Sequence, residues 1–108
     1  MGFLDRLRGG AAGARAADID YLRDWTRTRR GVEAFVEPRT TVTDVSVALV
    51  AHDGEWTRRV VGERGAHRLS GELGIPVYDV RKVGYPQRMR DYDARRRIER
   101  RRAMLADD

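Results

Sequence analysis

The segment VTDVSVALVAHDGEWTRRVV, residues 42–61, decides the fold predicted for this chain. Two runs rich in Val, Thr and Leu flank Asp53-Gly54, a dipeptide that accepts the positive φ angles of a two-residue type I′ turn. The segment is therefore predicted to form a β-hairpin. In the register that this turn sets, His52 faces Glu55, Ala51 faces Trp56, Leu49 faces Arg58, and Val47 faces Val60.

The alternation of side chains along a strand assigns these residues to two faces. One face carries Val45, Val47, Leu49, Ala51, Trp56 and Val60. The other carries Asp44, Ser46, Ala48, Thr57 and Arg59, with Val50 and Val61 among them. This pattern predicts an antiparallel sheet with one covered face and one mostly solvated face.

The flanking segments complete an α+β fold. A helix over residues 18–30 is predicted to begin at Asp18 as N-cap and to pack Ile19, Leu22 and Trp25 on the sheet. A strand over residues 32–37 precedes the hairpin, so that three strands form an antiparallel meander. On this first strand Phe35 is expected to pack with Val50 and Val61 on the otherwise polar face.

Three further elements follow the hairpin. A helix over residues 62–73 has apolar positions at helical spacing. A fourth strand over residues 75–80 contains Pro76, which indicates either an edge position in the sheet or the start of the strand. A basic helix over residues 87–104 comes last. The predicted organisation is a flexible tail (1–17), an α+β domain (18–84) and a basic C-terminal helix (85–108).

Residue types argue against catalysis and metal binding. The chain has no cysteine, and its two histidines, His52 and His67, do not have the spacing of metal ligands. Neither Ser46 nor Ser70 lies in a GxSxG motif, and the glycines do not spell GxGxxG. We therefore predict no catalytic residue, no metal and no cofactor. Without a signal peptide or a long apolar run, the protein is expected to be cytoplasmic.

The charge balance indicates an anionic partner. The formal net charge is +5, and Lys82 is the only lysine, so arginine supplies almost all of the positive charge. Arginine pairs with phosphate through two parallel hydrogen bonds and stacks on bases. The alternative is the codon bias of a GC-rich genome acting on a solvated surface. The predicted phosphate contacts are Arg59 on the open sheet face and Arg88, Arg95, Arg96, Arg97, Arg100, Arg101 and Arg102 on the C-terminal helix.

Two resemblances bear on function. The order helix, three-strand meander, helix over residues 18–73 is similar to that of double-stranded-RNA-binding domains, which recognise A-form helices by shape and phosphate. Residues 63–64 and 38–41 differ from the binding motifs of that family, so no binding residue is carried over. The stretches GVEAFVEP, DGEWTRR and GIPVYDVRKVGYPQRMRDY also resemble a group of small uncharacterised proteins of high-GC actinobacteria, which implies no known activity.

The sequence thus favours a non-enzymatic, basic binding module associated with RNA or the ribosome through its arginine-rich C-terminal helix. The alternative is a protein-interaction adaptor that docks on an acidic partner by its sheet edge or C-terminal helix. Exposure of Phe35 and Tyr92 beside arginines would favour RNA as the partner. Their burial, together with a free strand edge flanked by apolar surface, would favour the adaptor.

Overall fold

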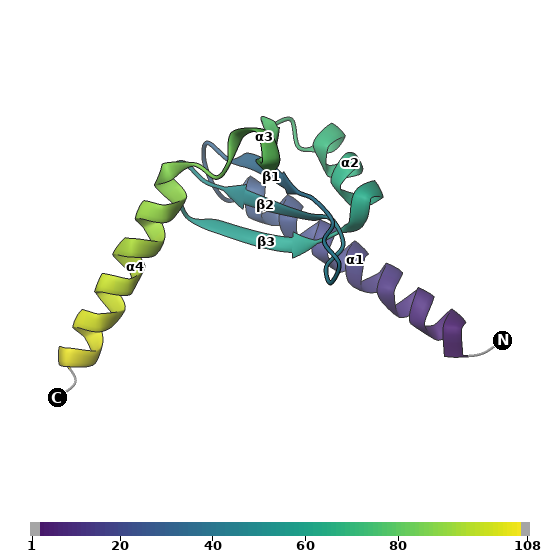
Figure 1. Cartoon of the computed structure of the whole chain (residues 1–108), viewed down its shortest axis with the longest axis horizontal. Coiled ribbons are helices and arrows are strands. Elements are labelled where there is room, and N and C mark those ends of the chain that lie inside the picture. Colours follow the sequence, from purple (N-terminus) through teal and green to yellow (C-terminus); the bar gives the residue numbers. More distant parts are fainter. Residues whose placement is uncertain (1–2, 107–108) are drawn as a thin grey trace.

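The computed structural model describes residues 3–106, with side chains from Arg15 onward, and confirms the α+β class (Figure 1). The elements follow the predicted order, with one additional short helix, α3. They are α1 (Phe3–Arg27), β1 (Glu33–Glu37), β2 (Ser46–Val50), β3 (Trp56–Val60), α2 (Gly62–Glu72), β4 (Val77–Asp79), α3 (Val80–Val83) and α4 (Gln87–Ala106).

The four strands form one sheet in the order β3-β2-β1-β4. Strands β1, β2 and β3 are the predicted antiparallel meander, and β4 is parallel to β1. Helix α2 therefore carries the chain from one edge of the sheet to the other. Pro76 directly precedes β4 at this second edge, and its carbonyl oxygen accepts a hydrogen bond from the N–H of Ala34. Pro76 was expected to mark an edge position or a strand start, and it directly precedes a strand at the sheet edge.

The predicted hairpin register is wrong by one residue. Val50 pairs with Trp56 and Ser46 with Val60, so three residues, 52–54, connect the closing pair Ala51 and Glu55. The N–H of Gly54 donates to the carbonyl oxygen of Ala51, and within the described residues glycines alone have positive φ. A type I′ turn would need a positive φ at Asp53 as well. The geometry is instead that of a type I turn followed by a left-handed glycine, the common three-residue hairpin loop.

The one-residue shift moves β3 side chains to opposite faces of the sheet from those predicted. Trp56 lies beside Val50 on the second face, away from α1 and α2. Thr57, and not Trp56, lies on the first face, where its hydroxyl group forms a hydrogen bond of 2.9 Å with that of Tyr21. The register prediction failed because Asp-Gly is compatible with both loop types.

Helices α1 and α2 cover the first face and form the larger core with it. Leu22, Trp25, Leu49 and Leu69 are among its buried members, as the helical spacing predicts for Leu22, Trp25 and Leu69. Gly65 is buried where the two helices meet, and a Cβ there would lie 3.3 Å from Cδ1 of Ile19. Glycine at this position permits the close approach of α2 to α1.

The second face is also covered, contrary to the prediction of a mostly solvated face. Phe35, Ala48, Val50 and Met89 form a smaller buried cluster, against which Trp56, Val80 and Tyr85 pack. Phe35 packs with Val50 as predicted, whereas Val61 belongs to the first core. The cover comes from the start of α4 and the segment before it, where apolar residues are too sparse for periodicity to indicate packing.

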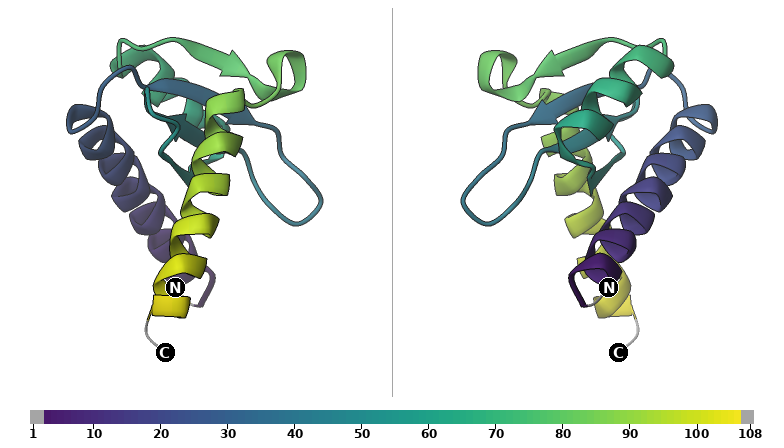
Figure 2. Two further views of the ribbon diagram at one scale, coloured as in Figure 1. Left: turned by 90° about the vertical axis from the view of Figure 1, so that its left-hand side faces the viewer. Right: turned by 90° about the vertical axis from the view of Figure 1, so that its right-hand side faces the viewer.

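The two terminal helices give the molecule its elongated shape of 57 × 35 × 29 Å. Helix α1 begins at Phe3 rather than at the predicted Asp18, so the segment expected to be a flexible tail is helical as far as Phe3. Its alanines have the highest helix propensity of any residue and continue the helix that Ile19 and Leu22 anchor. Figure 1 shows that the outer ends of α1 and α4 lie on opposite sides of the molecule, and in the views of Figure 2, turned by 90°, both helices extend away from the sheet in the same general direction.

Candidate nucleic-acid interface

The first turns of α4 are fixed to the sheet by Arg88 and Met89. Met89 is buried in the second core. The Nε of Arg88 donates to the carbonyl oxygen of Ala51 at 2.9 Å, and its Nη2 lies 2.5 Å from Oε1 of Glu33. Arg88, predicted as a phosphate contact, is thus engaged by the hairpin and β1, and we assign it an anchoring role.

Two more hydrogen bonds hold α4 against the hairpin. The indole Nε1 of Trp56 donates to Oδ1 of Asp93 at 2.8 Å, and Nη2 of Arg95 donates to the carbonyl oxygen of Asp53 at 2.8 Å. The hairpin loop approaches the helix so closely that a Cβ on Gly54 would lie 2.9 Å from Cβ of Tyr92. The docked part of α4 therefore ends near Arg95.

A buried carboxylate at the end of β1 remote from the hairpin loop, Glu37, orders the segment that leads into α4. Glu37 accepts hydrogen bonds from Ser46 at 2.8 Å, from Nε and Nη2 of Arg58 at 2.6 Å each, and from the hydroxyl of Tyr85. Burial raises the pKa of Glu37, but the hydrogen bonds from Arg58, Tyr85 and Ser46 together outweigh it and hold the pKa below its ordinary value. The charged form of Glu37 is thus the one that ties Tyr85 and β3 to β1.

Residues 95–106, which we call the C-terminal arm, project from the domain and are all exposed (Figure 1). The arm contains six arginines and a single acidic residue, Glu99, so its formal charge is +5, equal to that of the whole chain. Removing these seven residues from the 22 basic and 17 acidic residues leaves 16 of each. The remaining acidic residues include Asp107 and Asp108, so residues 1–94 carry a net charge of +2, and most of the positive charge of the protein lies in the arm.

The arginines of the domain differ from those of the arm in their ion pairing. Ten of the 13 arginines between Arg15 and Arg90 form ion pairs with carboxylates. Among the arm residues that the structure describes, one arginine does so, Arg96 with Glu99 at 3.2 Å. The domain neutralises its own arginines, and the arm leaves its arginines open to an external anion.

Arg59 is not brought together with the arm. In the observed register it lies opposite Val47, on the face that α1 covers. Its Nε is 3.4 Å from Oδ1 of Asp18, and its guanidinium lies 3.9 Å from the ring centroid of Tyr21. The predicted site residues thus divide into three groups: Arg59 beside α1, Arg88 at the anchor, and the six arginines 95, 96, 97, 100, 101 and 102 in the arm.

The aromatic residues that were expected to discriminate between partners give a divided result. Phe35 is 4% exposed beneath Met89 and Tyr85, so it offers no stacking surface. Tyr92 is half-buried, with the guanidinium of Arg95 at 5.9 Å from its ring centroid. Exposed apolar side chains lie on the arm itself: Ile98, Met104 and Leu105 are 51%, 74% and 67% exposed.

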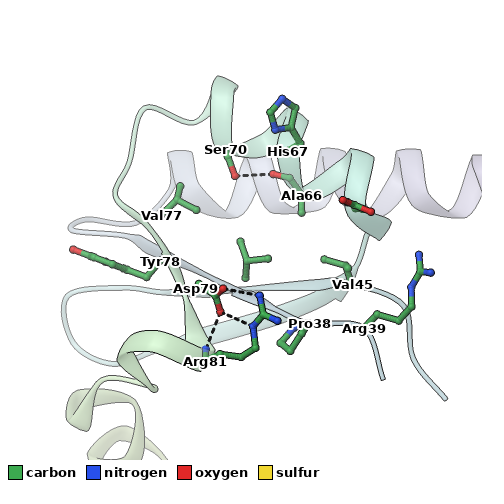
Figure 3. A pocket seen from close by; sticks show the side chains of 12 residues that line it. Pro38, Arg39, Val45, Ala66, His67, Ser70, Val77, Tyr78, Asp79 and Arg81 are labelled. Carbon is green, nitrogen blue, oxygen red and sulfur yellow. Dashed lines mark hydrogen bonds and ion pairs between the residues drawn. The ribbon is translucent and has the colours of Figure 1, made fainter. Parts of the chain in front are cut away.

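Figure 3 shows a cleft of about 480 Å³ between α2, the β1–β4 edge and the loop after β1, which sequence analysis did not predict. Three of its twelve lining residues are valines. Its two arginines already form ion pairs, Arg81 with Asp79 and Arg39 with Asp44. The hydrogen bonds from Arg81 lower the pKa of Asp79 to about 2. The lining comes from separate segments, so no local motif in the sequence could have indicated it.

Among the residues whose side chains the structure describes, 15–106, no group of three or more is positioned to hold a metal ion. Among the described helices, none combines the length and the hydropathy that a bilayer span requires. Comparison of the chain with protein-family models, curated proteins and solved structures found no match.

Proposed function

We propose that this protein is a non-enzymatic RNA-binding module, associated with free or ribosomal RNA of the cytoplasm, and that its C-terminal arm supplies the phosphate contacts. The observation that carries this proposal is the separation of charge: the arm has a formal charge of +5, against +2 for residues 1–94, and projects from a domain whose arginines are largely paired. A nucleic acid binds such a segment favourably, because each phosphate that an arginine neutralises releases bound counterions. Arginine adds bidentate pairing with phosphate and stacking on bases.

A protein-interaction adaptor is the second candidate. Burial of Phe35 and exposure of Ile98, Met104 and Leu105 on the arm support it, because an acidic partner with an apolar groove would use both the arginines and these side chains. The partner in that case is a protein, and its capture does not depend on RNA.

A truncation distinguishes the two. A chain ending at Ala94 keeps Met89 and Asp93, the contacts that dock α4, and loses the arm. We expect the full-length protein to recover RNA from lysate and the truncated protein to recover at least about tenfold less, since six arginines are lost and the net charge falls from +5 to +2. The measurement is sequencing and quantification of the co-purified RNA, with and without RNase.

Protein partners that survive RNase treatment and need the arm would contradict RNA binding and support the adaptor. Equal recovery of RNA by both chains would show that the arm is not the binding element. Unchanged circular dichroism of the domain, apart from the lost helical turns, is the control for folding.

A further inference from the structure

We infer, on the basis of the proposed function, that the arm enters a groove that encloses it on all sides: the deep major groove of an RNA helix that a bulge or internal loop has widened. The positions of the six arginines around the helix, their exposure and the dimensions of nucleic-acid grooves support this inference.

The arginines form three pairs on three faces of α4. With 3.6 residues per turn, side chains four or seven positions apart lie on nearly the same side of a helix. The three pairs are roughly 100–130° apart around the axis. They are Arg95 with Arg102, Arg96 with Arg100, and Arg97 with Arg101.

Apart from one hydrogen bond, from Arg95 to the hairpin loop, all three faces are free of the domain. Every residue from 95 to 106 is exposed, and beyond the bond from Arg95 to the carbonyl oxygen of Asp53 the arm contacts no other element through the hydrogen bonds and ion pairs of the described residues. A flat anionic surface would meet one face, or two neighbouring faces, and leave the third pair in solvent. Charge on three faces fits a partner with phosphates on more than one side.

Groove dimensions favour RNA over B-form DNA. An α-helix with its side chains is about 10–12 Å across, whereas the major groove of B-DNA is about 12 Å wide and only about 8.5 Å deep. A helix lying in B-DNA therefore keeps its outer face in solvent. The major groove of A-form RNA is deep but too narrow for a helix, so it must be opened locally before the helix can enter.

The sector between Arg101 and Arg102 contains Ile98 and Leu105 and no arginine. These two side chains are seven positions apart, on one side of the helix, and 51% and 67% exposed. In a groove this side suits contact with base edges and sugars at the floor. The pairs Arg95/Arg102 and Arg97/Arg101 flank it and would reach phosphates on the two walls, and Arg96/Arg100, on the opposite side of the helix, would reach phosphates at the rims of the groove.

Three double variants test the inference: R95Q/R102Q, R96Q/R100Q and R97Q/R101Q. Each variant removes two charges from one face, and glutamine has a helix propensity close to that of arginine. The variants R96Q/R100Q and R97Q/R101Q are matched controls of each other, whereas R95Q/R102Q also removes the hydrogen bond from Arg95 to Asp53. R64Q/K82Q removes two exposed charges from the domain as a further control. The probes are an RNA hairpin with a bulged stem, the same hairpin without the bulge, a single strand of equal length, and a B-DNA duplex.

Affinity is measured by fluorescence anisotropy between 50 and 200 mM salt. On the bulged hairpin we expect each arm variant to lose about tenfold to hundredfold in affinity and to reduce the salt slope by about 2, and the domain control to change affinity less than about twofold. The unbulged hairpin, the single strand and B-DNA should bind more weakly than the bulged hairpin.

If only one of the three arm variants lost affinity, or if the single strand bound as tightly as the bulged hairpin, binding in a groove would be excluded, while RNA binding would still stand. If B-DNA bound more tightly than the bulged hairpin, and replacement of one arginine pair left that affinity unchanged, the partner of the arm would be DNA and not RNA. Absence of salt-sensitive, arm-dependent binding to every probe would overturn the proposed function itself.

Discussion

Gly54→Ala is expected to destabilise the protein by about 2–5 kcal/mol and to loosen α4 from the sheet. Two effects combine at this position. Gly54 has φ of +93°, which an alanine adopts only with strain. The added Cβ would also collide with the carbonyl oxygen of Arg88 and lie 2.9 Å from Cβ of Tyr92. Because that oxygen belongs to the helix backbone, relief requires α4 to move.

Gly74→Ala is the matched control. Gly74 also has positive φ, +63°, but a Cβ there has no neighbour within 4 Å. Gly74→Ala is therefore expected to destabilise the protein through backbone strain alone, by about 1–2 kcal/mol. Unfolding in urea gives the free energies, and amide hydrogen exchange of residues 88–93 reports release of α4 before global unfolding.

Faster exchange in α4 for Gly54→Ala, and not for Gly74→Ala, is the expected result. Equal free energies of unfolding and equal exchange for the two variants would show that contact with the hairpin loop does not hold α4. The groove inference would then concern a helix that moves independently of the domain.

The sequence was sufficient for the element order because the signals were local. The hairpin runs, the apolar spacing of Leu22, Trp25 and Leu69, and the proline before β4 each predicted an element that the structure confirms. Asp53-Gly54 located the turn correctly, but not its length. Since the side-chain period of a strand is two, one extra loop residue was enough to send Trp56 to the opposite face.

The covered second face could not be predicted from hydrophobic periodicity. Helix α4 buries a single large apolar residue, Met89, and is held by Arg88, Asp93 and the close approach of Gly54. Such contacts depend on geometry across more than 30 residues of chain. For the same reason Arg88 was grouped with the arm arginines, from which it differs in having carbonyl and carboxylate partners.

Glu37→Gln is expected to destabilise the protein by about 2–3 kcal/mol. Glu37 is 8% exposed and accepts hydrogen bonds from Ser46, Arg58 and Tyr85. Glutamine loses the charge and replaces one acceptor oxygen with a donor, so a partner hydroxyl or guanidinium group is left unsatisfied. The full cost of breaking a buried pair is not expected, because the side chain of Arg58 is 41% exposed and water can solvate it.

The loss should depend on pH. The folded-state pKa of Glu37 lies below its ordinary value of 4.5, so the carboxylate contributes stability fully above about pH 4.5 and loses that contribution as pH falls through the lowered pKa. The difference in free energy of unfolding between wild type and Glu37→Gln should therefore be largest near neutral pH and shrink in acid. Urea unfolding at several pH values from neutral to about 3 measures it.

Glu72→Gln is the matched control, since Glu72 also pairs with arginines, Arg23 and Arg68, but at the surface. Solvent and salt screen that pair, so a much smaller change is expected, together with little effect on α4. Similar losses for the two variants would mean that burial of Glu37 adds nothing to its pairing. A larger loss for Glu37→Gln, with faster hydrogen exchange at residues 85–93, would establish that a buried carboxylate on β1 positions the segment from which the arginine arm extends.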